Sequence, residues 1–285
     1  PGATGGRASG MAVGLVANLT VGGLRRPARR SRAGGARKAA AAAARPAQLQ
    51  DLRQRARSAP QLGGRGRRFG AAASPQGFGA SPRELEENGH LCEHSTALFI
   101  CDLQGAFEPA ILGFDACAAT ASRLARAAGG FGMPVVVTEQ YPERLGATVD
   151  AVASALPDGE EKIVVPKLAF SMVVPEVEAH LSEKCPAVAQ VLLCGVEAHV
   201  CVLQTALDLL ARGYEVHVVV DGVSSRRAED RQVALARLRQ EGALLTTSEA
   251  ALFDLCGHAK APNFKLVSAL AKEERPPALP LLSDA

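Results

Sequence analysis

From residue 95 onward, short apolar runs alternate with stretches whose apolar residues recur every three or four positions. Six runs have the length and β-branched content of buried strands, and they are TALFIC (96–101), PVVVTEQ (134–140), KIVVPK (162–167), VLLCGV (191–196), EVHVVVDGV (215–223) and ALLTTSE (243–249). Helical spacing covers 107–130, 176–183, 198–210, 228–240 and 250–256. Strands that alternate with helices in this way favour a parallel sheet covered by helices on both faces. We therefore expect an α/β fold with a six-stranded parallel sheet.

The first ninety residues differ from the rest, because they are mainly Ala, Gly, Arg, Ser and Pro. Residues 1–82 contain fourteen Arg and one Lys against a single acid, whereas residues 83–285 contain 17 basic and 28 acidic residues. The formal net charge of +3 thus averages a basic leader and a mildly acidic body. Too little apolar surface is present in the leader to offset chain entropy. We predict a disordered leader over 1–90, a folded domain over 91–272 and a flexible, Pro-rich tail over 273–285.

The leader admits three interpretations. If Met11 is the start, the segment that follows is Arg-rich and free of acids, as organellar transit peptides are, which would place the protein in a mitochondrion or plastid. An inert leader would leave it in the cytoplasm. Nucleic-acid binding by the Arg-Gly stretch is the least favoured interpretation. No apolar stretch approaches the roughly 20 residues that a membrane-spanning helix needs, so we expect a soluble body and no membrane partner.

The seven cysteines indicate a reducing environment rather than a disulfide framework. Their number is odd, their spacing shows no close pairs, and several lie inside apolar runs. Such usage is typical of intracellular proteins.

Three residues with useful chemistry follow the ends of predicted strands. Asp102 follows TALFIC, Lys167 ends KIVVPK, and Cys201 lies shortly after VLLCGV. Ligands of parallel sheets bind beyond the carboxyl ends of the strands, so these side chains are expected at one edge. Cys201 also falls in the first turn of the predicted helix, where backbone N–H groups and the helix dipole favour a thiolate.

Each of these residues has an ordinary interpretation. Asp102 could cap a turn, Lys167 could lie in solvent, and Cys201 could fill the core. Together they supply a carboxylate base, a cation that holds a thiolate, and the thiol itself, which is the arrangement of an activated nucleophile. The combination favours an enzyme.

Four motifs at these positions resemble a known family. They are DLQGAF (102–107), VVVTEQYP (135–142), PKLAFSM (166–172) and GVEAHVCVLQTALDLLARGYEVHVVVDGVSSR (195–226). In this order they resemble the isochorismatase-like cysteine hydrolases, over about residues 95–272, and especially the branch of isochorismatase domain-containing proteins. The resemblance implies a Rossmann-like three-layer α/β/α fold and a catalytic triad of Asp102, Lys167 and Cys201. It also implies a cis peptide bond between Val196 and Glu197, with the backbone N–H groups of Glu197 and Cys201 forming an oxyanion hole.

The resemblance further implies hydrolysis of a small amide-like substrate at a C–N bond, through a thioester on Cys201, in a homo-oligomer without a cofactor. Nicotinamidases of the superfamily hold a metal with an aspartate and histidines after the second strand, whereas this chain has TEQYP there. We therefore predict no catalytic metal. Many members have Thr where this chain has Glu197, so we expect the carboxylate to change which substrates are accepted.

The predicted wall of the substrate pocket lies at or beyond strand ends. It consists of Phe107, Glu139, Tyr141 and Phe170, with Gln140 beside them, and ordinary loop packing is the alternative for each. For the whole protein the alternative to an enzyme is a catalytically silent member of the fold that acts as an interaction or scaffold module.

Overall fold

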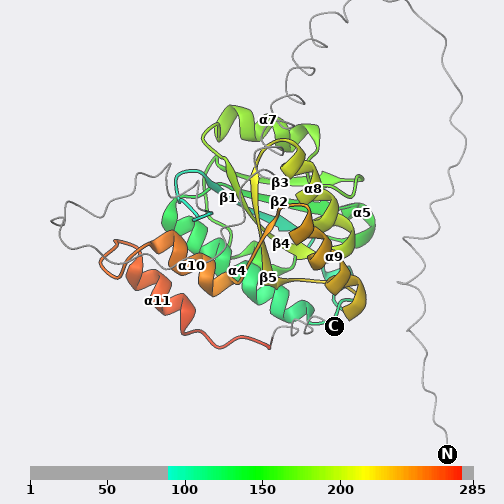
Figure 1. The fold of residues 1–285 in the computed structure, drawn as a ribbon. Coiled ribbons are helices and arrows are strands. Elements are labelled where there is room, and N and C mark those ends of the chain that lie inside the picture. The colour runs from blue at the N-terminus through cyan, green and yellow to red at the C-terminus, as the bar shows by residue number, and fades with distance from the viewer. Residues whose placement is uncertain (1–88, 278–285) are drawn as a thin grey trace, which may run out of the picture. The chain divides into compact units, whose positions relative to one another are not determined.

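A computed structural model describes residues 89–277 as one α/β unit built on a six-stranded sheet (Figure 1). The strands are β1 (Thr96–Cys101), β2 (Val135–Gln140), β3 (Lys162–Lys167), β4 (Gln190–Val196), β5 (Glu215–Ser224) and β6 (Leu244–Thr246). All pairings are parallel, in the order β3-β2-β1-β4-β5-β6. The prediction of an α/β fold with a six-stranded parallel sheet is confirmed. The predicted disordered leader, apart from residues 89 and 90, and residues 278–285 of the predicted tail lie outside the described residues.

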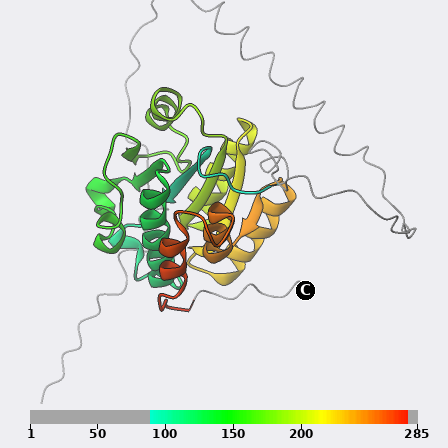
Figure 2. The same cartoon turned by 90° about the vertical axis from the view of Figure 1, so that its left-hand side faces the viewer.

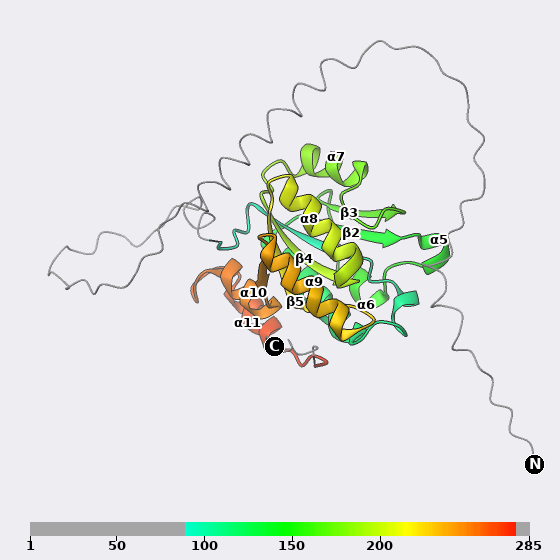
Figure 3. The ribbon, with the colours of Figure 1, turned by 45° about the vertical axis from the view of Figure 1, so that its right-hand side comes forward.

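Helices cover both faces of the sheet. One layer contains α4 (Phe114–Phe131), α6 (Asp150–Ala153), α10 (Ser248–Cys256) and α11 (Phe264–Ala271), and the other contains α7 (Pro175–Lys184), α8 (Leu203–Ala211) and α9 (Ala228–Gln240). In Figure 2 the orange and red helices α10 and α11 lie beside the green α4, and Figure 3 shows α8 and α9 across the opposite face. The short helical elements that remain in the described residues are the 3-10 helix Gly105–Phe107, α5 (Pro142–Leu145) and the π-helix Ala198–Val202.

The central strands are buried along their whole length because both faces of the sheet are covered. Every residue of β1 and of β4 is buried. Leu98 and Ile100 of β1 belong to the core beneath α4, whereas Phe99 and Cys101 belong to the core beneath α8 and α9. The continuous apolar runs of the sequence therefore reflect burial on two faces rather than on one.

The register aligns the carboxyl ends of the inner strands. Cys101, the last residue of β1, pairs with Thr138 of β2 on one side and with Gly195 of β4 on the other. Lys167, the last residue of β3, pairs with Gln140 of β2. Because β1 lies between β2 and β4, residues that directly follow these strands meet at the middle of one sheet edge.

The boundaries of the predicted helices are partly wrong. The helix predicted over 107–130 begins only at Phe114, after Gly113, which has a φ of 62° that favours glycine. The helix predicted to begin at Ala198 opens with a π-helical turn over Ala198–Val202, and regular α-helix starts at Leu203. Side-chain periodicity does not distinguish these variants from an α-helix.

The last predicted strand, ALLTTSE, is shorter than expected. β6 contains three residues, and α10 begins at Ser248, inside the predicted strand. The hydroxyl of Thr247 accepts a hydrogen bond from the backbone N–H of Ala250 at 3.2 Å and so caps α10. A capping threonine directly after a short apolar strand produces the same local pattern as a longer strand.

The predicted tail begins with residues that contact the domain. Glu273 forms an ion pair with Arg126 at 2.6 Å, and Arg275 forms one with Asp221 at 2.8 Å. Helix α11, which precedes these residues, and the short helices α5 and α6 were not predicted. Within residues 89–277 no helix has both the length and the hydropathy needed to cross a membrane.

Candidate active site

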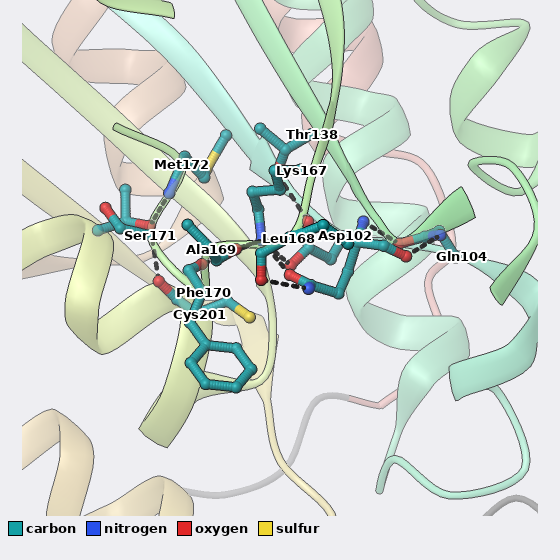
Figure 4. A network of polar contacts seen from close by, with 12 residues as sticks. Asp102, Gln104, Thr138, Lys167, Leu168, Ala169, Phe170, Ser171, Met172 and Cys201 are labelled. Atoms are coloured by element: carbon teal, nitrogen blue, oxygen red, sulfur yellow. Dashed lines mark hydrogen bonds and ion pairs between the residues drawn. The ribbon is translucent and has the colours of Figure 1, made fainter. Parts of the chain in front are cut away.

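A buried ion pair lies at the carboxyl edge of the sheet. Nζ of Lys167 is 2.7 Å from Oδ2 of Asp102, and the two side chains are 0% and 1% exposed. The hydroxyl of Thr138 donates to the other carboxylate oxygen, Oδ1, at 2.7 Å. Asp102 has a φ of 50°, a conformation that Asp adopts more readily than most residues. The carboxylate is therefore held on both oxygens in a fixed orientation (Figure 4).

Lys167 lies among oxygen atoms on every side. Besides Asp102, its ammonium group donates to Oε1 of Gln140 at 2.7 Å and to the carbonyl oxygens of Ala169 and Phe170 at 3.2 and 3.0 Å. Burial alone would lower the pKa of Lys167. The negative charge available on Cys101, Asp102 and Cys201, and the hydrogen bond to Asp102, raise the pKa above its ordinary value. Lys167 is therefore protonated and positively charged at neutral pH.

Cys201 lies beside this pair. It is the fourth residue of the π-helical turn, and 6% of it is exposed. Its sulfur, an oxygen of Asp102 and the sulfur of Cys101 all lie within 4.8 Å of one another. The structure thus brings together the three residues of the predicted triad, which come from positions separated by about one hundred residues of chain.

The turn before Cys201 depends on a glycine. Gly195 has a φ of 116°, and a Cβ atom added there would collide with the backbone of Cys101. The next peptide bond, between Val196 and Glu197, is cis, at the position that the resemblance implies. Glycine therefore allows β4 and the start of the helix to approach the end of β1 closely.

Glu197, predicted to contribute to an oxyanion hole, directly follows the cis bond. Within residues 89–277 its backbone N–H makes none of the turn, loop or cap hydrogen bonds between main-chain groups. Its side chain is 17% exposed, and Oε2 accepts the backbone N–H of Arg226 at 3.0 Å. The partners of this carboxylate are thus a main-chain amide and, at 3.9 Å, Nδ1 of His199.

The predicted pocket residues have different environments. Tyr141 lines a pocket of about 210 Å³ together with Pro142, Glu143, Pro166, Lys167 and Leu168. Phe170 is 40% exposed and contacts Lys167 through its carbonyl. Glu139 accepts the backbone N–H and hydroxyl of Thr148 at 2.7 and 2.8 Å, which ties the following loop to β2. Phe107 packs against the core beneath α4. Its environment is therefore that of ordinary loop packing, the alternative to a place in the pocket wall.

Several residues that shape the site did not come from the sequence. Thr138 orients Asp102, and Gln140, named only as a wall residue, hydrogen-bonds Lys167. Gln104 is fully buried and exchanges hydrogen bonds with the backbone of Gln140 at 2.7 and 3.0 Å. The polar residues at the end of VVVTEQ and in DLQ were the available signal. The sequence contained no such signal for Cys101, because this residue ends an apolar run.

Three of these groups offer donor atoms that a metal ion could use. They are the thiols of Cys101 and Cys201 and the carboxylate of Asp102. Burial, a hydrogen bond with Cys201 and the charge of Asp102 raise the pKa of Cys101 well above its ordinary value. The ammonium of Lys167 already occupies one carboxylate oxygen. This donor set fits a cation poorly, since a ligating sulfur must be a thiolate and the site already holds a positive charge.

A six-stranded parallel sheet whose carboxyl edge gathers a buried carboxylate, an ammonium and a thiol defines a class, the isochorismatase-fold hydrolases. A family model described as the isochorismatase domain matches residues 96–250. The chain belongs to this family.

Relatives support this assignment. Isochorismatase domain-containing protein 2 of Xenopus laevis is 45% identical over 192 residues, which cover 67% of this chain and 91% of the relative. The structure of MAR1 ribonuclease from Caenorhabditis elegans is 43% identical, with a TM-score of 0.63, and the match covers 69% of this chain and all of that one. The predicted resemblance to isochorismatase domain-containing proteins is confirmed.

A more distant structure concerns assembly. The YcaC gene product from Escherichia coli, described as an octameric hydrolase of unknown specificity, is 21% identical with a TM-score of 0.54 and covers 64% of this chain and 88% of its own. Relatives with this fold therefore include an octameric hydrolase. At this identity the likeness shows the fold alone, so the homo-oligomer expected for this chain stays a prediction.

Proposed function

We propose that the protein is a cysteine hydrolase that cleaves a C–N bond in a small amide-like substrate. The observation that carries this proposal is the meeting of Cys201 with the buried Asp102–Lys167 pair, within 4.8 Å of the carboxylate. A surface lysine and aspartate would serve stability or solubility. A fully buried pair beside a slightly exposed thiol is costly to build and supplies each group that nucleophilic catalysis needs.

The reaction begins with proton transfer from the thiol of Cys201 to the carboxylate of Asp102. The positive charge of Lys167 stabilises the thiolate that remains. The thiolate attacks the carbonyl carbon of the substrate and forms a tetrahedral intermediate, whose oxyanion accepts hydrogen bonds from the backbone N–H groups of Glu197 and Cys201. Asp102 returns the proton to the leaving nitrogen as the C–N bond breaks, which leaves a thioester on Cys201.

The second half of the reaction restores the thiol. A water molecule loses a proton to Asp102 and attacks the thioester carbonyl. The thiolate of Cys201 leaves, is stabilised again by Lys167 and regains its proton from Asp102. Thr138 and Lys167 each bond one carboxylate oxygen, and each oxygen keeps a second lone pair for these transfers.

The size of the pocket favours a small substrate. The 210 Å³ pocket is lined by Lys167 of the triad, but not by Asp102 or Cys201. Sites for drug-sized ligands span about 300–1,000 Å³. We infer that a single small amide, ureide or carboxamide ring fits, and that a peptide chain does not.

The test compares the wild type with Cys201→Ala on a panel of small amides, ureides and nicotinamide. Hydrolysis by the wild type and its loss in the variant are expected, and equal turnover by both proteins would refute the triad. Cys92→Ala is the matched control, since Cys92 is only partly buried and lies near the amino end of β4, where its backbone N–H bonds Gln190 at 2.9 Å. This control should keep full activity.

Alkylation gives a readout that does not require the substrate. Because Lys167 stabilises a thiolate, iodoacetamide near neutral pH should modify Cys201 faster than any of the other six cysteines. Modification of Cys201 no faster than Cys92, combined with no turnover, would favour the catalytically silent interaction module.

RNA belongs in the same panel, because the Caenorhabditis elegans relative is called a ribonuclease. The excess of acidic residues in 83–285 disfavours binding of a polyanion to the domain. We expect no RNA cleavage that depends on Cys201.

A further inference from the structure

A second sulfur faces the proposed nucleophile. The sulfur of Cys101 lies within 4.8 Å of the sulfur of Cys201. Cys101 is completely buried. The proposed hydrolysis does not use it.

The fold holds these two cysteines together. Cys101 is the last residue of β1 and pairs with Gly195, whose missing Cβ lets the two backbones touch. The chain then turns at Glu197 into the π-helical segment that carries Cys201. The end of β1 and the first helical turn after β4 therefore present their sulfurs to each other. Side-chain rotation about the Cα–Cβ bonds is the motion that changes the remaining separation.

We propose that Cys101 and Cys201 are a thiol modification site, in which a hydroperoxide oxidises Cys201 and Cys101 then closes a reversible disulfide that stops hydrolysis. In the first step the sulfur of Cys201 attacks one oxygen of hydrogen peroxide, the O–O bond breaks, and the products are a sulfenic acid and water. In the second step the sulfur of Cys101 attacks the sulfur of the sulfenic acid. The S–O bond breaks, the S–S bond forms, and the thiol proton leaves with the hydroxyl group as a second water molecule. Two thiols lose two hydrogens, and one peroxide is reduced to two waters.

The order of the steps follows from accessibility and charge. Cys201 has a small exposed surface, whereas Cys101 has none, so peroxide meets Cys201 first. Burial raises the pKa of Cys101 well above its ordinary value, which keeps this thiol protonated and unreactive towards peroxide. The carboxylate of Asp102 lies within 4.8 Å of both sulfurs and can carry the proton from Cys101 to the leaving hydroxyl.

The chain contains its own internal control. Cys117 and Cys194 form a second pair of buried thiols close enough to interact electrostatically, in the core beneath α4. Burial raises the pKa of Cys117 to about 12 and that of Cys194 further. In the described part of the chain the charged groups that act on this pair are Arg231 and Asp221. If the proximity of two buried thiols were sufficient for oxidation, both pairs would oxidise equally.

The experiment treats the reduced full-length protein with a small excess of hydrogen peroxide, blocks free thiols with an alkylating agent and maps all seven cysteines by peptide mass spectrometry. The expected product is a peptide that links Cys101 to Cys201, lighter by two hydrogens and cleaved by dithiothreitol, with Cys117 and Cys194 still reduced. In Cys101→Ala, the same peroxide should carry Cys201 to the sulfinic acid, and dithiothreitol should no longer restore the free thiol. Cys92→Ala should behave as the wild type.

Two results would overturn the proposal. One is a sulfinic acid on Cys201 of the wild type while Cys101 remains free, and the other is a Cys117–Cys194 link that forms as fast as the Cys101–Cys201 link. The proposal rests on the reactivity of Cys201 in the proposed function, but mass reports the link without any substrate. A link in a protein that hydrolyses nothing would therefore refute the hydrolase and keep the modification site. If Cys101→Ala does not fold, the wild-type map decides alone.

Discussion

Replacement of Lys167 by Met should destabilise the domain strongly, because it removes one half of a buried ion pair. The variant keeps the length of the side chain and deletes its charge. Asp102 then remains fully buried, with Thr138 as its one side-chain donor. Removing one partner of a buried pair costs about 3–5 kcal/mol, against total stabilities of about 5–15 kcal/mol.

Thermal unfolding measures this effect. For a domain of this size each kcal/mol lowers Tm by about 2–4 °C, so Lys167→Met should unfold roughly 6–20 °C below the wild type. The double variant Asp102→Asn/Lys167→Met should be less destabilised than the sum of the two single variants, since it leaves no unpaired charge.

A matched control separates burial from mere ion pairing. Lys184 forms an ion pair with Glu160 at the same 2.7 Å distance, but its side chain is 50% exposed. Lys184→Met should therefore leave Tm close to the wild-type value. If Lys167→Met lowers Tm no more than Lys184→Met does, the argument that the Asp102–Lys167 pair is an energetically costly buried site is wrong.

Two further predictions follow from the same region. The pKa of Lys167 is raised in the folded protein above its ordinary value of 10.5, so the stability it contributes is fully present below about pH 10.5 and is lost as the pH rises through the folded value. In urea titrations, the difference in free energy of unfolding between the wild type and Lys167→Met should therefore shrink only above that pH. A difference that shrinks between pH 6 and 9 would contradict the raised pKa. Gly195→Ala places a Cβ against the backbone of Cys101 at a φ of 116°. It should lower the free energy of unfolding in urea by more than about 1 kcal/mol and slow the alkylation of Cys201. The control Gly213→Ala is also at positive φ but has open space around it, so it should leave the alkylation rate unchanged.

The architecture could be predicted because both its signals were strong. The alternation of apolar runs with helical spacing indicated the parallel sheet, and the ends of the predicted strands indicated Asp102, Lys167 and Cys201. Helix boundaries were less accessible, since a π-helical turn and an α-helical turn have similar apolar spacing. The start of α4 depends on the left-handed Gly113, which no periodicity reveals.

The residues that hold the site in place could not be predicted from the sequence, and the reason is different. Thr138 reaches Asp102 only because β2 and β1 pair in one particular register, and a strand sequence alone does not state its neighbour's register. Phe170 was predicted only as a wall residue, and the hydrogen bond from Lys167 to its carbonyl was not predicted. Cys101 looked like a core residue by composition, and its burial agrees with that. Its second property, proximity to another sulfur, depends on Gly195 of β4, three strands later in the sequence.

The strand order also determines when the site can exist during synthesis. Asp102 and Lys167 are translated before Cys201, and β1 stays an exposed edge until β4 emerges and pairs with it. A nascent chain stalled before residue 190 thus carries the carboxylate and the ammonium group of the site without its thiol. Since domains form as units during translation, the sulfur of Cys201 should meet Asp102 and Lys167 only after β4 has been synthesised and has paired with β1.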